Sequence, residues 1–77
     1  MPVPILLPEL DLPAAQLCQW LVRRGEAVVE GDPLLEVLAG EVLVEIPAPA
    51  TGTLVRRAVR EGEPLTTGME LGRIDVP

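Results

Sequence analysis

The sequence predicts an all-β fold, a small flattened β-barrel or sandwich in which two similar halves pack against each other. Three observations support this prediction. Short segments rich in Val, Leu and Ile are separated by Gly, Pro or Asp at short intervals. Nine prolines and seven glycines interrupt every window in which a helix of three turns would form. The third observation is an internal repeat.

The repeat appears when the sequence is shifted by 37 positions. "VRRGEAVVEGDPLLEV", residues 22–37, then aligns with "VREGEPLTTGMELGRI", residues 59–74. Two glycine pairs coincide with the same six-residue spacing, Gly25 and Gly31 in the first half, Gly62 and Gly68 in the second. Because glycine at a fixed position marks a turn, we expect two turns to recur in register and the halves to be related by a pseudo-twofold axis.

The individual strands are predicted from short apolar segments, taken in chain order. Six segments follow, at residues 17–22, 27–29, 33–38, 42–46, 53–59 and 71–76. The segment Val42-Leu43-Val44-Glu45-Ile46 has the two-residue period of a half-buried strand. "LPAAQLCQWLVRR", residues 12–24, is the one stretch where a helix is the alternative.

Length and charge limit the function classes. We expect 77 residues to form one monomeric domain, 1–77. The net charge of −6, with six arginines and neither lysine nor histidine, argues against nucleic-acid binding. We expect no membrane span and no targeting segment, because the chain lacks a long apolar run and a basic leader. A single cysteine, Cys18, forms no internal disulfide and fits a reducing, cytoplasmic location.

No catalytic or metal site is predicted. The chain has no histidine, no cluster of metal ligands and no nucleophile beside a base, so we do not expect an enzyme. Trp20 is expected to cover part of a thin core, and Cys18 to lie in the core or at half-buried positions. The cluster of Arg56, Arg57 and Arg60 is expected to be a solvated edge.

The repeat also predicts where the turn at Gly40-Glu41 lies. Shifting Gly40 back by 37 gives position 3, and shifting Glu41 forward gives position 78, so the symmetry mate of this turn is the pair of chain ends. We therefore expect the turn at one end of the domain and the termini together at the other. Glycine suits the turn because a tight hairpin favours a residue that tolerates positive φ.

The sequence resembles a known family, the lipoyl and biotinyl carrier domains, and most closely the lipoyl domains of 2-oxo acid dehydrogenase acyltransferases. The resemblance rests on Pro8 after an opening strand and on "QWLVRRGEAVVEGDPLLEV" (19–37), "VEIPAPATGTL" (44–54) and "REGEPLTTGMELGRI" (60–74). It implies a barrel-sandwich hybrid of two four-stranded sheets with pseudo-twofold symmetry. It also implies that the loop at residues 8–16, shorter here than is common, lies beside the hairpin and contributes to partner recognition.

The resemblance implies a site at the hairpin turn, where the family's modified lysine receives lipoate or biotin in amide linkage. Counting back from Val44-Glu45-Ile46-Pro47, this lysine falls on Glu41, the preceding aspartate on Gly40, and the following small or apolar residue on Val42. A carboxylate cannot form the amide, and the chain has no lysine to replace it. We therefore expect no attached lipoate or biotin.

Three functions remain open at this stage. The first is a protein-interaction or structural module related to 2-oxo acid dehydrogenase complexes, with Glu36, Glu41 and Glu45 forming an acidic end that a basic partner recognises. Within this reading, Glu41 is alternatively a harmless residue at a site that has decayed. The second is a working carrier domain, which would need a lysine that this chain lacks. The third is a structural lipoyl-like part of a larger adaptor protein.

Overall fold

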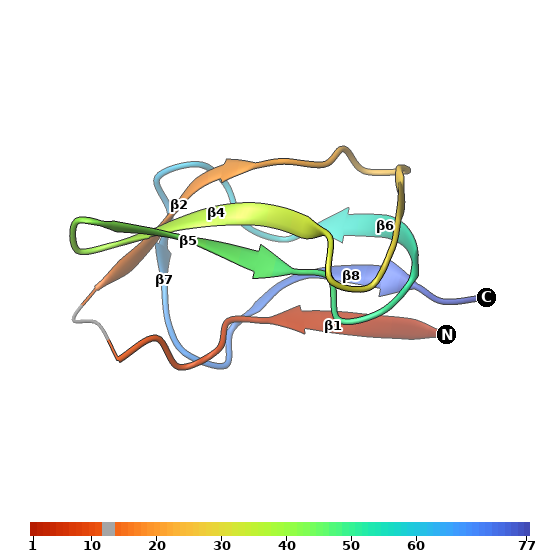
Figure 1. Cartoon of the computed structure of the whole chain (residues 1–77), viewed down its shortest axis with the longest axis horizontal. Helices are drawn as coiled ribbons and strands as arrows, with labels where there is room; N and C mark the ends of the chain where they lie inside the picture. The colour runs from red at the N-terminus through yellow and green to blue at the C-terminus, as the bar shows by residue number, and fades with distance from the viewer. Residues whose placement is uncertain (12–13) are drawn as a thin grey trace.

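The computed structural model describes residues 1–11 and 14–77, and the described part consists of eight strands and their connections, without a helix. The strands are β1 (Pro2–Leu6), β2 (Ala15–Trp20), β3 (Ala27–Val28), β4 (Pro33–Ala39), β5 (Val42–Pro47), β6 (Gly52–Arg57), β7 (Pro64–Leu65) and β8 (Glu70–Asp75). They form two four-stranded antiparallel sheets, ordered β1-β8-β6-β3 and β5-β4-β2-β7 (Figure 1). The predicted all-β fold with two such sheets is confirmed.

The helical alternative for residues 12–24 is wrong over Ala15–Trp20, which form strand β2. Residues 12–13 of that stretch lie outside the described residues. Across the ranges 1–11 and 14–77, no helix is long and apolar enough to cross a membrane.

The two sheets are related by the repeat. Adding 37 to the residue numbers of β2 gives those of β6, and β3 becomes β7 in the same way. The first residue of β4, Pro33, likewise maps onto the first residue of β8, Glu70. With β5 in the place of β1, this exchange converts one sheet order into the other. The pseudo-twofold symmetry predicted from the sequence is therefore present in the backbone.

The repeated turns are held by matching hydrogen bonds. The Gly25 amide donates to the Leu54 carbonyl at 2.6 Å, and the Gly62 amide donates to the Leu17 carbonyl at 2.7 Å. Both glycines have positive φ, 94° and 82°, a conformation that side chains disfavour. Each turn of one half is thus fastened to a central strand of the other half.

Symmetric β-bulges modify the strand register. The pairing of β2 with β4 skips Cys18 between Leu17 and Gln19, and the pairing of β6 with β8 skips the repeat mate, Val55. Cys18 is exposed, so the expectation of a core or half-buried thiol is wrong. The physical reason is the bulge, because the extra residue is left unpaired and the regular alternation of inward and outward side chains is broken there.

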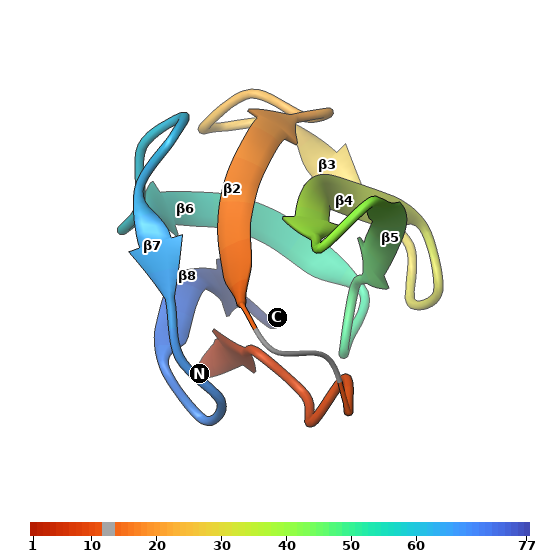
Figure 2. The ribbon, with the colours of Figure 1, turned by 90° about the vertical axis from the view of Figure 1, so that its left-hand side faces the viewer.

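The hydrophobic core lies between the sheets and takes residues from both halves. The chain surrounds it when viewed from the hairpin end (Figure 2). Its buried members are Ile5, Leu7, Leu17, Val28, Leu34, Leu35, Val37, Ile46, Ala48, Leu54, Val59, Leu65, Leu71 and Ile74. Trp20 packs against this cluster, and its indole N–H donates to the Val59 carbonyl at 3.0 Å. The side chain therefore has the covering role that the sequence predicts.

The molecule is elongated, with principal extents of 36 × 19 × 18 Å. The first and last residues lie together at one end, where β1 pairs with β8 and the Val76 amide donates to the Met1 carbonyl at 3.0 Å. The turn between β4 and β5 lies at the opposite end (Figure 1). The sequence repeat predicts this layout.

Candidate functional site

The tip of the β4–β5 hairpin is a two-residue turn made of Gly40 and Glu41. The last paired residues before it are Ala39 and Val42. Gly40 has φ 63°, whereas among the described residues other than glycine only Asp11 has positive φ. Positive φ at the first central position alone, filled by glycine, is the pattern of a type II′ turn, whose twist matches that of the flanking strands. The three residues predicted for the site therefore lie together at the tip.

The chain before β2 supports the tip. The Gly40 amide donates to the Ala14 carbonyl at 3.2 Å, which ties the turn to the segment entering β2. The predicted position of the loop at residues 8–16 beside the hairpin is thus met at Ala14, while residues 12–13 lie outside the described residues. This contact joins residues 26 positions apart, and no local pattern in the sequence indicates it.

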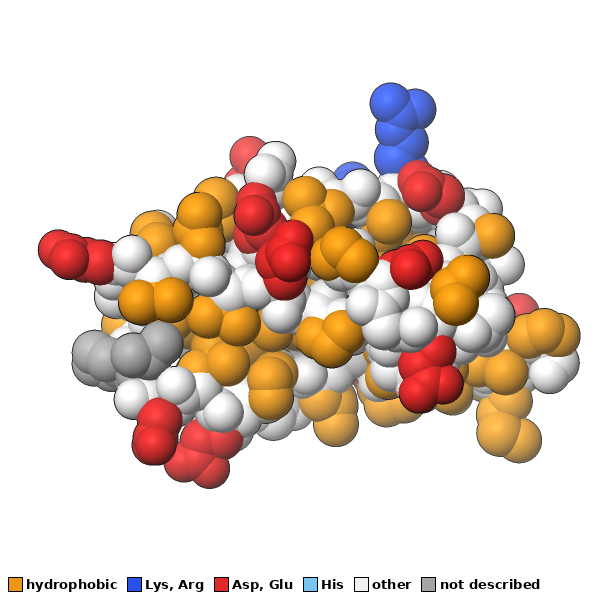
Figure 3. Space-filling view, in the orientation of Figure 1, with side chains coloured by type: hydrophobic (Ala, Val, Ile, Leu, Met, Phe, Trp, Pro, Cys, Tyr) orange, Lys and Arg blue, Asp and Glu red, His pale blue; other side chains and the backbone are white. Residues whose placement is uncertain are grey.

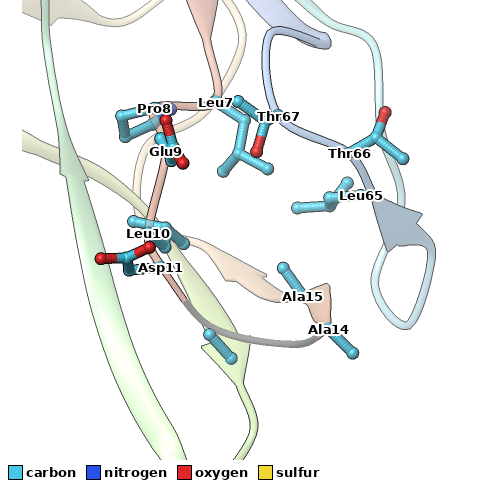
Figure 4. A pocket seen from close by; sticks show the side chains of 11 residues that line it. Leu7, Pro8, Glu9, Leu10, Asp11, Ala14, Ala15, Leu65, Thr66 and Thr67 are labelled. Atoms are coloured by element: carbon cyan, nitrogen blue, oxygen red, sulfur yellow. The ribbon is translucent and has the colours of Figure 1, made fainter.

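A cavity of about 620 Å³ lies between this loop and β7. Figure 4 shows its walls, with Leu7 and Leu65 extending into the space from opposite sides and the carboxylates of Glu9 and Asp11 on one margin. Thr66 and Thr67 line the margin on the side of β7.

Acidic side chains surround the hairpin. Glu41 is exposed at the turn, and Glu36 and Glu45 are directly opposite each other on β4 and β5. The Gln19 side-chain amide donates to the Glu36 carboxylate at 2.6 Å. None of the three carboxylates forms an ion pair within residues 1–11 and 14–77. Figure 3 shows acidic side chains at the turn and along the hairpin, interspersed with hydrophobic ones.

The hairpin also exposes two large apolar side chains, those of Val42 and Leu43. Val42 is 51% exposed and Leu43 is 55% exposed. Leu43 is opposite the half-buried Leu38 on the outer face of the sheet. Finding this pair requires the register of β4 on β5, which the sequence pattern alone does not provide.

The described residues contain no group of three or more His, Cys, Asp or Glu side chains placed to hold a metal ion. Within the same residues, no buried side chain is polar or charged. The hairpin tip is therefore a solvated, acidic and partly apolar surface, whose chemistry suits contacts with another molecule.

Comparisons with known proteins identify the family. The model of the biotin/lipoyl family, described as "Biotin-requiring enzyme", matches residues 10–74. The solution structure of the lipoyl domain of the 2-oxoglutarate dehydrogenase complex from Azotobacter vinelandii has the same fold, with a TM-score of 0.73. That match covers 94% of this chain and 96% of the other at 22% sequence identity, so it concerns the fold alone.

Curated relatives give the same result at higher identity. The dihydrolipoyllysine-residue acetyltransferase component of the pyruvate dehydrogenase complex of Mycobacterium tuberculosis is 37% identical over 75 residues, 95% of this chain. The corresponding protein of Staphylococcus aureus is 36% identical over 62 residues, 80% of this chain. The chain spans 14% of the length of each of these relatives. On these matches and its two symmetric sheets, the chain belongs to the biotin/lipoyl domain family and is related to the lipoyl domains of 2-oxo acid dehydrogenase acyltransferases.

Proposed function

We propose that this domain has kept the lipoyl-domain scaffold but receives neither lipoate nor biotin, and that it acts as a protein-interaction or structural module related to 2-oxo acid dehydrogenase complexes. The observation that carries the proposal is Glu41 at the exposed turn, the position where the family resemblance places the modified lysine. Attachment through an amide needs an uncharged amine as the nucleophile, and a carboxylate does not form this bond.

The other nitrogen atoms of the chain do not replace the missing amine. The 77 residues contain six arginines and no lysine, and a guanidinium stays protonated at physiological pH. The Met1 amino group donates to the Val76 carbonyl at 2.8 Å and lies 3.3 Å from the Asp75 carboxylate, at the end opposite the turn. The donor set at the tip thus does not fit covalent lipoate or biotin, and no carrier step is assigned to this chain.

The relatives support an origin in a carrier domain that is not itself the catalyst. They are acetyltransferase components of pyruvate dehydrogenase complexes, and the part shared with this chain is a small fraction of their length. We assign no catalytic role to this domain. Its proposed activity is contact with a protein partner through the tip and the acidic side chains of Glu36, Glu41 and Glu45.

Intact mass tests the proposal. The chain is co-expressed with a lipoyl ligase and lipoate, and separately with a biotin ligase and biotin, next to a natural lipoyl or biotinyl domain as a positive control. We expect the mass of this chain to equal its sequence mass in both cases while the control domain is modified. An adduct that survives hydroxylamine would contradict the proposal, because an amide resists this reagent whereas an ester or thioester does not.

A further inference from the structure

We propose that the outer face of the β5-β4-β2-β7 sheet beside the tip binds an extended basic segment of a partner protein. An apolar side chain of the segment lies on a row of Leu43, Leu38, Gln16 and Pro64, and its flanking Lys or Arg side chains contact Glu41 and Glu45. This inference rests on the proposed function, because it assigns the partner of a tip that has no attached group.

The row crosses the whole sheet at one level. Leu38 on β4 is paired with Leu43 on β5 and with Gln16 on β2, and Gln16 is paired in turn with Pro64 on β7. Residues directly opposite each other on neighbouring strands lie side by side on the same face. Leu43, Gln16 and Pro64 are exposed and Leu38 is half-buried, so the row forms a continuous accessible strip.

Part of the row lies in a hollow of about 260 Å³. The hollow is lined by Ala14, Ala15, Gln16, Leu38, Gly40 and Pro64. Gln16 is the one residue of this lining with a polar side chain, so an apolar side chain of a partner is the group that fits. Two residues of the lining are joined directly, because the Gly40 amide donates a hydrogen bond to the Ala14 carbonyl.

Carboxylates lie on both sides of the apolar row. Glu41 lies beyond it at the turn, and the pair of Glu36 and Glu45 lies two residues further from the turn along β4 and β5. Glu36 accepts a hydrogen bond from Gln19, whereas Glu41 and Glu45 have no ion-pair partner within the described ranges. A segment with an apolar residue between basic residues matches this order of acid, apolar strip and acid.

The second half of the repeat shows that the fold does not need Leu38 and Glu36 at their positions. At the level equivalent to the apolar row, the opposite sheet pairs Asp75 with Pro2 and Thr53, so Asp75 takes the position of Leu38. At the level equivalent to the acidic pair, Arg73 takes the position of Glu36 and is opposite Arg56. The same backbone therefore accepts a carboxylate where the tip half has the half-buried Leu38, so the fold does not require a leucine at this position.

A second copy of the chain is a poorer occupant. The net charge of −6 makes two copies repel, and the acidic tip would have to approach another acidic molecule. The same negative charge attracts a basic segment at distances up to the Debye screening length.

The test is an NMR titration of the isotope-labelled domain, with its unmodified state verified by mass. The probe is the peptide acetyl-Arg-Arg-Leu-Arg-Arg-amide, and the matched probe has Ser in place of Leu. We expect amide shifts confined to residues 14–16, 38–45 and 65, since Pro64 has no amide proton, and tighter binding of the Leu probe. Leu43→Ser should remove the advantage of the Leu probe.

Charge variants complete the test. Glu41→Gln and Glu45→Gln should each weaken the Leu probe by about two- to fivefold at low salt, the range of an exposed ion pair. Glu30→Gln, which removes an exposed acid outside this face, should change the affinity by less than either variant.

Several results would overturn the inference. They are the absence of shifts at millimolar probe, shifts centred on the opposite sheet, equal affinity for the Leu and Ser probes, or an equal effect of Glu30→Gln. Shifts in the same residues that depend on protein concentration without any probe would assign the face to a second copy instead. Because these readouts use unmodified protein, they fail or succeed independently of the lipoylation test.

Discussion

The outer faces of the two sheets share one backbone arrangement and differ in chemistry. β4 presents Glu36 and Leu38 to solvent, whereas the equivalent positions on β8 are Arg73 and Asp75. At Leu17 and Leu54 the interior has not diverged, because these repeat mates are both buried leucines. This core position thus keeps a buried leucine in both halves, while the outer rows differ in charge and polarity. The fold therefore does not require the particular side chains of these outer rows.

The Gly40-Glu41 turn also differs from the repeated turns, because it has no equivalent in the other half. The turns at Gly25 and Gly62 have matching hydrogen bonds to the opposite half. The hairpin turn has no mate inside the repeat, because the chain ends lie at its equivalent position. The repeat therefore relates the turns at Gly25 and Gly62 to each other, whereas the hairpin turn has no equivalent turn in the other half.

The largest effect is expected in the shared interior. Leu17→Ala and Leu54→Ala should each lower the free energy of unfolding by about 2–5 kcal/mol, because each leaves a cavity in the core. Urea unfolding followed by the fluorescence of Trp20 measures both. A much larger loss of stability in one variant than in the other would show that the two halves do not contribute equally to the core, which would contradict their equivalence.

The next largest effect on stability is expected at Gly72 on β8, where the backbone lies close to Arg56 and Trp20. A Cβ atom at Gly72 would overlap the carbonyl oxygen of Arg56 and crowd the ring of Trp20 at 3.2 Å. We expect Gly72→Ala to cost about 1–3 kcal/mol, the range of overpacking in a well-packed interior. The repeat mate of Gly72 is Leu35, a buried leucine, so the variant measures how far the halves have diverged inside. Unchanged stability in urea would show that β6 and β8 can separate at no cost.

The smallest effects are expected at the tip. Gly40→Asp places a side chain on a residue with φ 63° and should cost about 1–2 kcal/mol, although nothing lies within 4 Å to clash with it. Glu41→Gln at the neighbouring exposed position should stay within about 0.5 kcal/mol of wild type. Thermal unfolding of both variants checks the difference. Equal stability would mean that the turn relaxes to a conformation without positive φ.

Much of the fold is predictable from the sequence because it is repeated. The glycine spacing indicated two equivalent turns, and the apolar segments placed six strands near their observed positions. Strand β7, Pro64–Leu65, is too short for a hydrophobic pattern, but adding 37 to β3 would have located it. The exposure of Cys18 was missed because alternation assumes a regular register, which a bulge breaks.

The site was predictable only in part. The position of Gly40, Glu41 and Val42 at a hairpin tip followed from sequence order and family resemblance. The hydrogen bond between Gly40 and Ala14 and the row of Leu43, Leu38, Gln16 and Pro64 did not follow. Both depend on pairings between segments distant in the chain, and such pairings are set by strand register.

The central claim is that the scaffold has been kept and that the attachment chemistry is lost at residue 41. The most direct measurement is the intact mass of wild type and Glu41→Lys after reaction with lipoate, ATP and a lipoyl ligase. Gly40 is left unchanged to avoid strain at its positive φ. The account predicts no mass gain for wild type and a single lipoyl addition to Glu41→Lys. A lipoyl adduct on wild type would contradict it, and so would a folded Glu41→Lys that stays unmodified while a natural lipoyl domain is fully modified.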